Sequence, residues 1–349
     1  MSRPALLALA TGLLIGCADT NAPPPEPLEL LLIVNRQGNS LTIASVDGTE
    51  SPTIVPLGGA RSTPSTVAAR EGIAVVPLGE GDAVAVVDLI ARTVIQRIAL
   101  PVGSGATGAA MLTDSVAYVA NPGLNTITRV NVYTADTAEV AVGVHPQGIA
   151  VARGRLFVLN GNLDETGEPA GPSWISVVNP ATNIVGDSIP LTGPGNAAFA
   201  TVGAEGLLYV INRGRTTVAE GRLSVVDPLE RTEIASFADL GLLPGDLAPH
   251  GRSRIFVSSF TEGLLEFNTD SNAVVRGEED GIAIPTNTGV AVDSEGRIYA
   301  IEAGGCVAGQ PGVAHVLNEE LEEIGRIRLG RCSAGATVVR IGLDATDGL

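Results

Sequence analysis

Residues 115–152, SVAYVANPGLNTITRVNVYTADTAEVAVGVHPQGIAVA, decide the fold. Four short runs in this stretch have the composition of β-strands: residues 116–120, 126–132, 139–142 and 149–152. Turn-forming residues separate the runs, notably Asn121-Pro122-Gly123 and His145-Pro146-Gln147-Gly148. Short strands with Gly, Pro and Asn between them predict an antiparallel meander of four strands.

The meander recurs along the chain. An Asp or Asn follows each third-strand run, at Asp47, Asp88, Asn131, Asn179, Asp227, Asn268 and Asn318, with successive gaps of 41, 43, 48, 48, 41 and 50 residues. The preceding strand recurs as LLIVN (31–35), IAVVP (73–77), VAYVA (116–120), LFVLN (156–160), LYVIN (208–212), IFVSS (255–259) and IYAIE (298–302). Seven units of this length predict seven four-stranded propeller blades.

The repeat resembles a known family. Ala117-Tyr118-Val119-Ala120-Asn121 and Leu208-Tyr209-Val210-Ile211-Asn212 are similar to the YVTN-type β-propeller repeat, and residues 145–151 resemble its turn into the next innermost strand. The resemblance covers roughly residues 30–343 and is strongest in the third to fifth units. It implies an all-β, seven-bladed β-propeller of four-stranded antiparallel blades.

The two ends of the repeat region predict how the ring closes. The first unit begins with a second-type strand at residues 31–35, while an extra strand, residues 336–343 (ATVVRIGL), follows the last unit. We expect this strand to complete blade 1, because that exchange leaves no exposed edge. The expected propeller spans residues 30–343, with a tail at 344–349.

The N-terminus predicts export. Arg3 precedes an apolar stretch from Ala5 to Ile15 that is too short to span a bilayer. Leu14-Ile15-Gly16-Cys17 resembles the lipobox of bacterial lipoproteins, which implies removal of residues 1–16 and acylation of Cys17. An ordinary signal peptide is the alternative. Residues 17–29 read as a Pro-rich tether. The resemblance implies a lipid anchor at the cell envelope, on the periplasmic side of the outer membrane or at the cell surface.

Composition limits the partners. The net charge of −17 disfavours nucleic acid, since no basic stripe can release phosphate counterions. Aromatic residues make up only 3%, which argues against stacking platforms. We therefore expect an envelope protein or a small polar ligand as the partner, and a monomeric chain.

Two cysteines remain in the repeat region. Cys306 falls in a loop of unit seven and Cys332 in the turn that leaves the same unit. In an exported domain such a pair suggests a disulfide, with two free thiols as the alternative. Closing a loop of this length stabilises by about 3 kcal/mol.

Loop lengths predict a binding face. In a propeller, the loops between second and third strands share one face with the connections between blades. Long insertions at residues 161–172, 213–221 and 303–312 all fall on this face, where binding usually occurs. The turns that converge on the channel mouth carry candidate binding residues: Arg61, Ser65, Thr107, His145, Gln147, Asn196, Asp246, Asn287 and Arg331. Arg61 and Arg331 are the candidate anchors for an anion; the alternative is that the ring merely solvates the mouth.

Signals for catalysis or metals are weak. His145 reads as a turn residue, His250 is expected on the opposite face and His315 on a third strand, so the three cannot form one cluster. The loop 160–165 collects oxygen ligands but lacks EF-hand spacing, so an acidic solvated loop is preferred over a Ca²⁺ site. We predict no cofactor, no metal and no catalytic residue.

The sequence thus favours a non-enzymatic binding or scaffold propeller that uses its loop-rich face. Whether the chain is an enzyme stays open. Seven-bladed lactonases and streptogramin-lyase-like proteins share the implied architecture, and some place a metal over the channel. In that alternative Asn196, Asp246 and Asn287 would supply oxygen ligands and His145 an acid or base. A purely structural envelope protein is a third reading.

Overall fold

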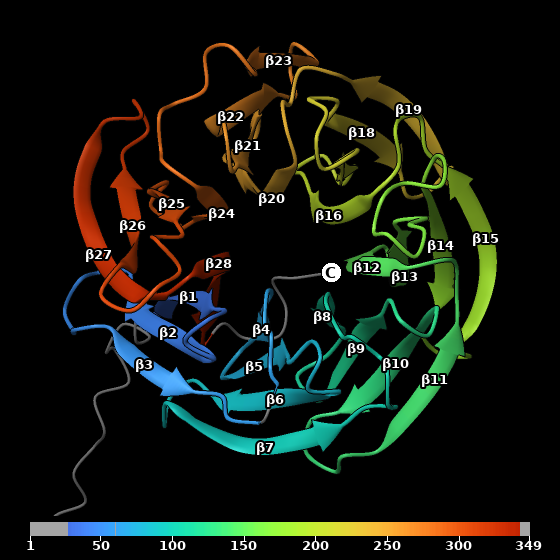
Figure 1. Cartoon of the computed structure of the whole chain (residues 1–349), viewed down its shortest axis with the longest axis horizontal. Helices are drawn as coiled ribbons and strands as arrows, with labels where there is room; N and C mark the ends of the chain where they lie inside the picture. The colour runs from blue at the N-terminus through green and yellow to red at the C-terminus, as the bar shows by residue number, and fades with distance from the viewer. Residues whose placement is uncertain (1–26, 60, 343–349) are drawn as a thin grey trace, which may run out of the picture.

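The chain forms a ring of seven four-stranded antiparallel sheets around a central channel (Figure 1). The computed structural model describes residues 27–59 and 61–342. Within this range there are 28 strands and no helix. The architecture is that of a seven-bladed β-propeller, as the repeat predicts.

The strands of each blade follow one another from the channel outward. Blade 1 is built from β28 (Ser333–Ile341), β1 (Leu28–Asn35), β2 (Ser40–Ser45) and β3 (Thr53–Pro56). Blade 2 holds β4 (Ala68–Arg70), β5 (Ile73–Pro77), β6 (Ala83–Asp88) and β7 (Thr93–Ala99); blade 3 holds β8 (Ala109–Met111), β9 (Val116–Asn121), β10 (Thr126–Asn131) and β11 (Thr137–Ala141). Blade 4 holds β12 (Pro146–Ala152), β13 (Arg155–Asn160), β14 (Trp174–Asn179) and β15 (Ile184–Pro190).

The last three blades repeat the same order. Blade 5 holds β16 (Ala197–Val202), β17 (Leu208–Asn212), β18 (Arg222–Asp227) and β19 (Thr232–Phe237). Blade 6 holds β20 (Pro244–His250), β21 (Arg254–Ser259), β22 (Gly263–Asn268) and β23 (Ala273–Arg276). Blade 7 holds β24 (Asn287–Val292), β25 (Ile298–Glu302), β26 (Pro311–Leu317) and β27 (Glu323–Arg331).

The predicted ring closure is confirmed. Strand β28 pairs antiparallel with β1, with Leu31 opposite Val338 and Ile33 opposite Ala336. The strand begins three residues before the predicted start at Ala336, and the predicted end at Leu343 lies outside the described residues. Strand β1 also begins earlier, at Leu28, so it includes the last two residues of the expected tether.

A side-chain contact explains the repeated Asp or Asn after each third strand. In all seven blades its side-chain oxygen accepts a backbone N–H two to four residues further on, at 2.8 to 3.1 Å. Asp88, for example, accepts the N–H groups of Ile90 and Ala91. Asn and Asp favour turns through this bond, so the residue that marks the repeat is the one that turns the chain into the fourth strand.

A second contact explains the Asn at the end of the second strand. The Asn121 amide donates to the hydroxyls of Thr126 and Thr128 on the neighbouring strand, at 3.0 and 2.8 Å. Asn35 makes the same pair of bonds to Ser40 and Thr42. These asparagines are fully buried, and a buried polar group is costly unless it is hydrogen-bonded. The Asn of the repeat is therefore structural.

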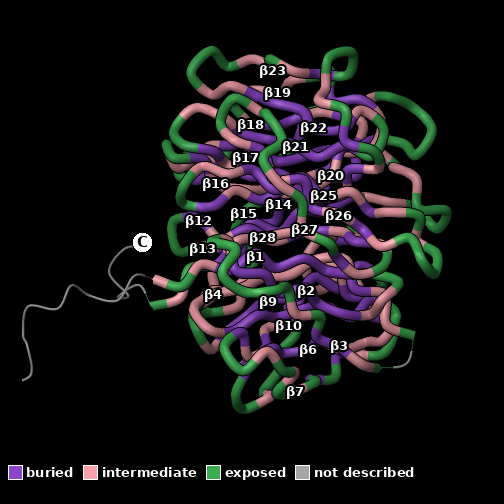
Figure 2. The backbone as a smooth tube through the Cα atoms, turned by 90° about the vertical axis from the view of Figure 1, so that its left-hand side faces the viewer, coloured by how far each residue is buried: buried purple, intermediate pink, exposed green. Residues whose placement is uncertain are grey.

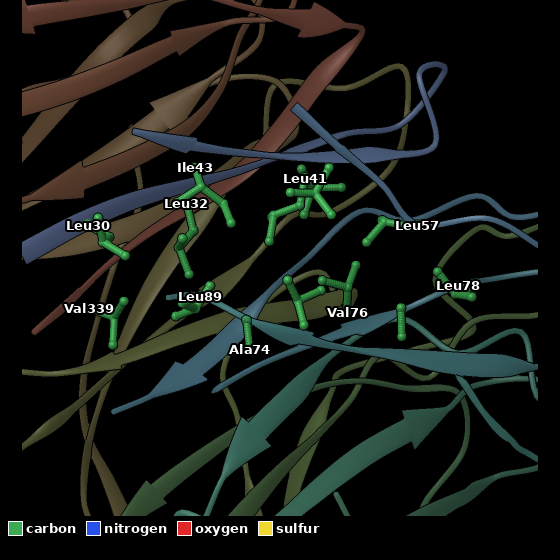
Figure 3. Close-up of a cluster of buried hydrophobic side chains, with 14 residues drawn as sticks. Leu30, Leu32, Leu41, Ile43, Leu57, Ala74, Val76, Leu78, Leu89 and Val339 are labelled. Atoms are coloured by element: carbon green, nitrogen blue, oxygen red, sulfur yellow. The ribbon is translucent and has the colours of Figure 1, made fainter. Parts of the chain in front are cut away.

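The core lies between blades. Seven clusters of buried apolar side chains occur among the described residues, one at each blade–blade interface. Figure 3 shows the cluster of blades 1 and 2, where Leu32 and Ile43 face Ala74 and Val76. Viewed from its edge, the ring has a buried interior and exposed loops on both faces (Figure 2). No blade buries its apolar surface alone, so the ring is one cooperative unit.

The long loops share one face with the connections between blades, as expected. They span residues 161–173, 213–221 and 303–310. The Asn196 N–H, in the connection into blade 5, donates to Gly161 O at 2.8 Å, and the Arg213 N–H donates to Asn196 O at 3.0 Å. We call this the loop-rich face. Leu28 and its partner Ile341 lie at the other end of their strands, so the described chain enters and leaves the ring on the opposite face.

Candidate functional site

A cavity of about 710 Å³ opens at the mouth of the channel on the loop-rich face. All seven blades contribute to its wall. A second cavity of about 210 Å³ continues it into the channel, and Thr66, Ala198, Phe199 and Gly335 line both. The volume of the outer cavity is in the range of small-molecule sites. We call the outer space the mouth cavity.

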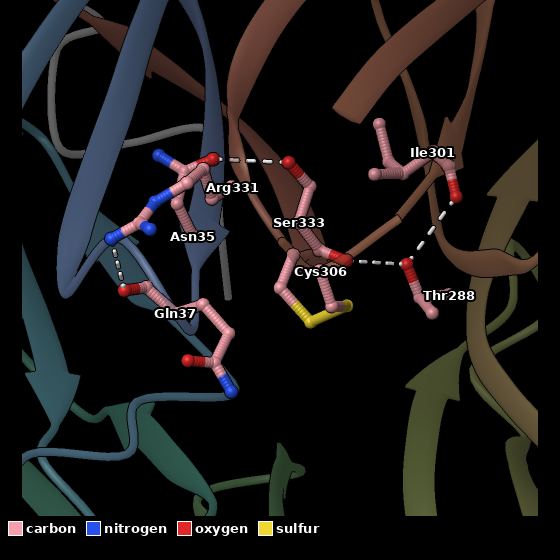
Figure 4. Close-up of a disulfide and its surroundings, with 8 residues drawn as sticks. Asn35, Gln37, Thr288, Ile301, Cys306, Arg331 and Ser333 are labelled. Atoms are coloured by element: carbon pink, nitrogen blue, oxygen red, sulfur yellow. Dashed lines mark hydrogen bonds between the residues drawn. A yellow bond between two sulfur atoms is a disulfide. The ribbon is translucent and has the colours of Figure 1, made fainter. Parts of the chain in front are cut away.

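Hydroxyl and amide groups around the mouth cavity link one blade to the next. Thr66 donates to the carbonyl of Thr107, and Thr107 donates to that of Gln147 at 3.0 Å. Gln147 continues the chain by donating to Asn196 Oδ1 at 2.7 Å. Thr288 donates to Ser333 O at 2.8 Å (Figure 4). These groups donate to other parts of the protein, so they fix the shape of the mouth and leave few hydrogen-bond donors for a ligand.

One side of the mouth cavity is apolar. Blade 5 contributes Phe199, and blade 6 contributes Leu242, Leu243 and Phe260. Phe260 is 54% exposed, although it is a large apolar side chain. An exposed aromatic surface in a concave site is a feature of binding sites for organic molecules.

Arg213 lies against this apolar wall. Its guanidinium carbon is 5.8 Å from the centre of the Phe199 ring, and its Nε donates to Pro244 O at 3.2 Å. Burial lowers the pKa of this guanidinium. Among the described residues it has no carboxylate within 4.0 Å. The terminal nitrogens of Arg213 are thus donors without a protein counter-ion.

Arg36 supplies a second positive charge to the mouth cavity. It follows β1 in blade 1, while Arg213 follows β17 in blade 5, and these blades lie on opposite sides of the channel in Figure 1. Arg36 is exposed. The described lining contains these two arginines and no carboxylate, while Glu168 and Glu262 accept hydrogen bonds from the lining residues Thr216 and Leu242.

Asp246 lies deeper, in the wall of the inner cavity. Its carboxylate accepts the N–H of Leu247 at 3.0 Å and that of Ala336 at 3.1 Å, and the N–H of Val290 also contributes. Enclosure in the narrow channel raises the pKa of Asp246 to about 7 although these hydrogen bonds oppose the shift. Its oxygens are occupied by the first strands of blades 6, 7 and 1.

The structure distributes the predicted mouth residues over different positions. Gln147 and Asn287 line the mouth cavity, as do Ser65 and Thr107. Asn196 is buried behind the wall, where its amide donates to Gly214 O at 3.0 Å. Asn287 donates to Gly263 O at 3.0 Å, and its side-chain oxygen is buried without a partner.

His145 is a turn residue. Its backbone has a φ of +53°, its N–H donates to Asn125 Oδ1 at 2.8 Å, and its carbonyl accepts the N–H of Gly161 at 2.9 Å. Burial lowers the pKa of the imidazole. The side chain is not part of the described lining of either channel cavity.

The two candidate anion anchors also lie outside the mouth cavity. Arg61 is exposed and approaches Glu80 at 3.9 Å. Arg331 is exposed and donates to Gln37 O at 3.2 Å (Figure 4). Arg61 lies in the connection that leaves β3, Arg331 is the last residue of β27, and both side chains contact neighbouring loops. The arginines in the cavity wall are Arg36 and Arg213 instead.

Three cavity residues outside the predicted set share one position in the repeat. Arg36, Arg213 and Phe260 each come directly after the last residue of a second strand. All three line the mouth cavity. The equivalent residues of the other four blades, Leu78, Pro122, Gly161 and Ala303, are buried and do not line the cavity, so the position alone does not predict a channel-facing side chain.

The predicted disulfide is present. Cys306 and Cys332 are bonded across a sequence separation of 26 residues. The bond ties the loop 303–310 to the start of β28 on the loop-rich face (Figure 4). It therefore fixes the residue from which the closing strand departs.

The other two histidines and the acidic loop of blade 4 lie at separate places in the ring. His250 contacts Gly296 O at 3.0 Å on the opposite face, and His315 lies in β26 between Glu302 and Glu323, at 2.9 and 2.8 Å. Asp164 accepts the N–H of Thr166 within its own turn at 2.8 Å. Within residues 27–59 and 61–342, no three His, Cys, Asp or Glu side chains lie close enough to hold a metal ion.

Comparison with solved structures identifies the class of protein: this chain is a seven-bladed β-propeller. It is similar to virginiamycin B lyase from Staphylococcus aureus (TM-score 0.61, 14% identity, 79% of this chain and 91% of that one). It is also similar to hydrazine synthase from Kuenenia stuttgartiensis, with a TM-score of 0.60 and 14% identity over 80% of this chain and 96% of that one. A functionally unknown protein from Desulfotomaculum acetoxidans has a TM-score of 0.65 and 13% identity over 90% of this chain and 99% of its own.

At these identities the similarity establishes the fold and nothing of the activity. No protein-family model matches the chain, and no curated protein matches it. Across the part of the chain that is described, no helix has the length and apolar character needed to cross a membrane.

Proposed function

We propose that the chain is a non-enzymatic binding or scaffold propeller of the YVTN type, anchored at the bacterial cell envelope through a lipidated Cys17. It binds through the loop-rich face. The observation that carries this proposal is the mouth cavity, which all seven blades line on the face opposite to the one where the chain enters the ring.

The proposed anchor and the mouth cavity lie on opposite faces of the ring. Strand β1 begins on the opposite face, where the Glu29 carboxylate accepts the Ser294 N–H at 3.0 Å and its hydroxyl at 2.7 Å. Cys17 and Pro27 are ten positions apart in the sequence, and a fully extended chain of that length spans at most about 35 Å. In this proposal a lipid on Cys17 attaches to the ring from the side of the opposite face, so the tether does not cover the loop-rich face.

Binding needs a wall that holds its shape. The loops of blades 4 and 5 contact each other, since the Glu168 carboxylate accepts the backbone N–H of Thr216 at 3.2 Å and also its hydroxyl. The disulfide holds the loop of blade 7. Long loops supported on rigid strands are the usual place of recognition.

The lyase or lactonase alternative has no observation of its own. The oxygens of Asn196 and Asp246 accept hydrogen bonds from the protein, and Asn287 donates to Gly263. Similarity to virginiamycin B lyase at 14% identity carries the fold alone. The proposal therefore stays with binding.

Partner capture from envelope extracts tests the proposal. One variant lacks residues 165–167 and another lacks residues 216–219, so that Arg213 and Glu168 stay in place. A third variant lacks residues 49–51, an exposed turn of similar length between β2 and β3 on the opposite face, and should keep the partner. We expect the first two to lose the partner. Equal capture by the first two variants and the unshortened chain would refute the use of this face.

A matching fractionation tests the anchor. The wild-type chain is expected with the membranes and the Cys17→Ser variant in the soluble envelope fraction. If both variants fractionate with the soluble proteins, no lipid anchor is present.

A further inference from the structure

The mouth cavity combines two features that belong to one kind of ligand. Arg213 offers guanidinium donors without a protein counter-ion, and it does so beside an apolar wall that includes Phe199 and Phe260. We propose that the mouth cavity binds a small organic monoanion with an apolar body, a carboxylate in the first place, whose charged end lies on Arg213. This deepens the proposed binding function and rests on it.

Arg213 is positioned for such a contact. Its Nε–H is used by Pro244 O, which fixes the plane of the guanidinium and leaves the terminal N–H groups for a ligand. A planar guanidinium matches the two oxygens of a carboxylate in a bidentate pair. Keeping this group partly out of water without a counter-ion is unfavourable, since a desolvated charge is stable only when paired.

The rest of the wall selects the remainder of the ligand. The threonine hydroxyls and Gln147 donate to neighbouring blades, so they offer mainly acceptor positions. Phe199, Phe260, Leu242 and Leu243 form the surface beside Arg213. A ring or short hydrocarbon chain buries these groups and gains from the loss of apolar surface to water.

The net charge of the chain also restricts the class of ligand. The chain carries a net charge of −17, and its field disfavours highly charged anions such as nucleotides or inorganic phosphate. A single negative charge is opposed least by that field and is balanced by Arg213. Arg36, from the far side of the channel, raises the local potential without being needed for the direct contact.

The test is a binding series on the purified chain by titration calorimetry. Hydrocinnamate has the proposed carboxylate and ring, hydrocinnamyl alcohol keeps the ring without the charge, and inorganic phosphate keeps charge without the ring. We expect hydrocinnamate to bind about 10- to 100-fold more tightly than the alcohol, the range for a hydrogen bond to a charged group. We expect phosphate to bind more weakly than hydrocinnamate.

Two variants and one control make the test specific. Arg213→Met removes the preference for the acid over the alcohol. Arg215→Met changes a neighbouring arginine that pairs with Glu220 at 3.4 Å and does not line the cavity, so it leaves the preference unchanged. Thermal unfolding of each variant shows whether it is folded.

Arg213→Lys gives a second readout. The natural sequence contains no lysine, so the new side chain is unique and its acylation can be followed by peptide mass. We expect bound hydrocinnamate to slow that acylation, while hydrocinnamyl alcohol at the same concentration slows it less.

The inference is overturned if hydrocinnamate does not bind, if the alcohol binds as tightly, or if Arg213→Met keeps the acid preference. Partner capture by Arg213→Met separates this result from the broader proposal. If that variant still captures an envelope partner through the loop-rich face, the proposed function stands and only the ligand class is wrong.

Discussion

The Asp246 carboxylate accepts the backbone N–H of Ala336 at 3.1 Å. The two residues lie in the first strands of blades 6 and 1, and Ala336 belongs to the strand that closes the ring. Since Leu247 and Val290 also donate to this carboxylate, one side chain holds three adjacent blades together at the channel. The residue that sequence reasoning placed in a binding ring thus supports the ring closure.

The first prediction concerns the pH dependence of this contact. The pKa of Asp246 is raised from 3.8 to about 7 in the folded chain. A raised carboxyl pKa means that the folded state binds more protons than the unfolded state between these values, so the contribution of Asp246 to stability falls as pH rises from about 4 to 7. Asp246→Asn removes that contribution.

Urea unfolding of the wild type and Asp246→Asn at pH 5 and pH 8 measures the effect. Because the channel leaves the side chain partly exposed, we expect the stability of the wild type relative to the variant to drop by about 1–3 kcal/mol between these pH values. A relative gain for the wild type at the higher pH would contradict the raised pKa.

The second prediction concerns the closing strand. A chain that ends at Gly335 keeps the disulfide and loses most of β28, and with it the buried Val339. We expect a loss of at least about 3 kcal/mol and concentration-dependent association, because β1 becomes an exposed edge. Urea unfolding and sedimentation compare it with a chain that ends at Gly342. Equal stability of two monomers would show that β28 does not close the ring.

The third prediction concerns the disulfide. Replacing both Cys306 and Cys332 by Ala is expected to cost about 3 kcal/mol, because the bond closes a loop whose ends are 26 residues apart. Thermal unfolding with and without reductant checks this, since the wild type under reductant should match the double variant. An unchanged midpoint in both would mean that the bond does not constrain the unfolded chain.

The fourth prediction concerns the Asn of the repeat. Asn121→Ala removes two hydrogen bonds and leaves the Thr126 and Thr128 hydroxyls without their donor. We expect a loss of about 1–3 kcal/mol in urea unfolding. Thr137→Ala, an exposed residue of the same blade, is the control and should change stability little. A loss no larger than the control's would mean that the Asn is not structural.

The fold was predictable because its determinants are local and repeated. The Asx turn after each third strand needs only the residues Asp88 to Ala91 in blade 2, and its recurrence sets the number of blades. Ring closure followed from a missing strand at one end and a surplus strand at the other. The disulfide followed because both cysteines fall on the same face.

The site was less predictable because it depends on side-chain direction. Arg61 has a φ of +61° and leans toward Glu80 rather than the channel, a result of local backbone geometry that composition does not reveal. The mouth threonines donate to the carbonyls of the next blade, and those partners are about 40 residues away in sequence. Arg213 lies at the start of a long loop, residues 213–221, where the strand pattern does not specify the direction of a side chain.

Site-specific photo-crosslinking in the envelope tests the central claim most directly, namely that the loop-rich face binds. A photoreactive phenylalanine replaces Phe260, 54% exposed in the mouth cavity, or Ile90, 60% exposed in a turn of the opposite face. The account predicts an adduct from position 260 and none from position 90. Adducts from position 90 alone, or from neither position, would contradict it.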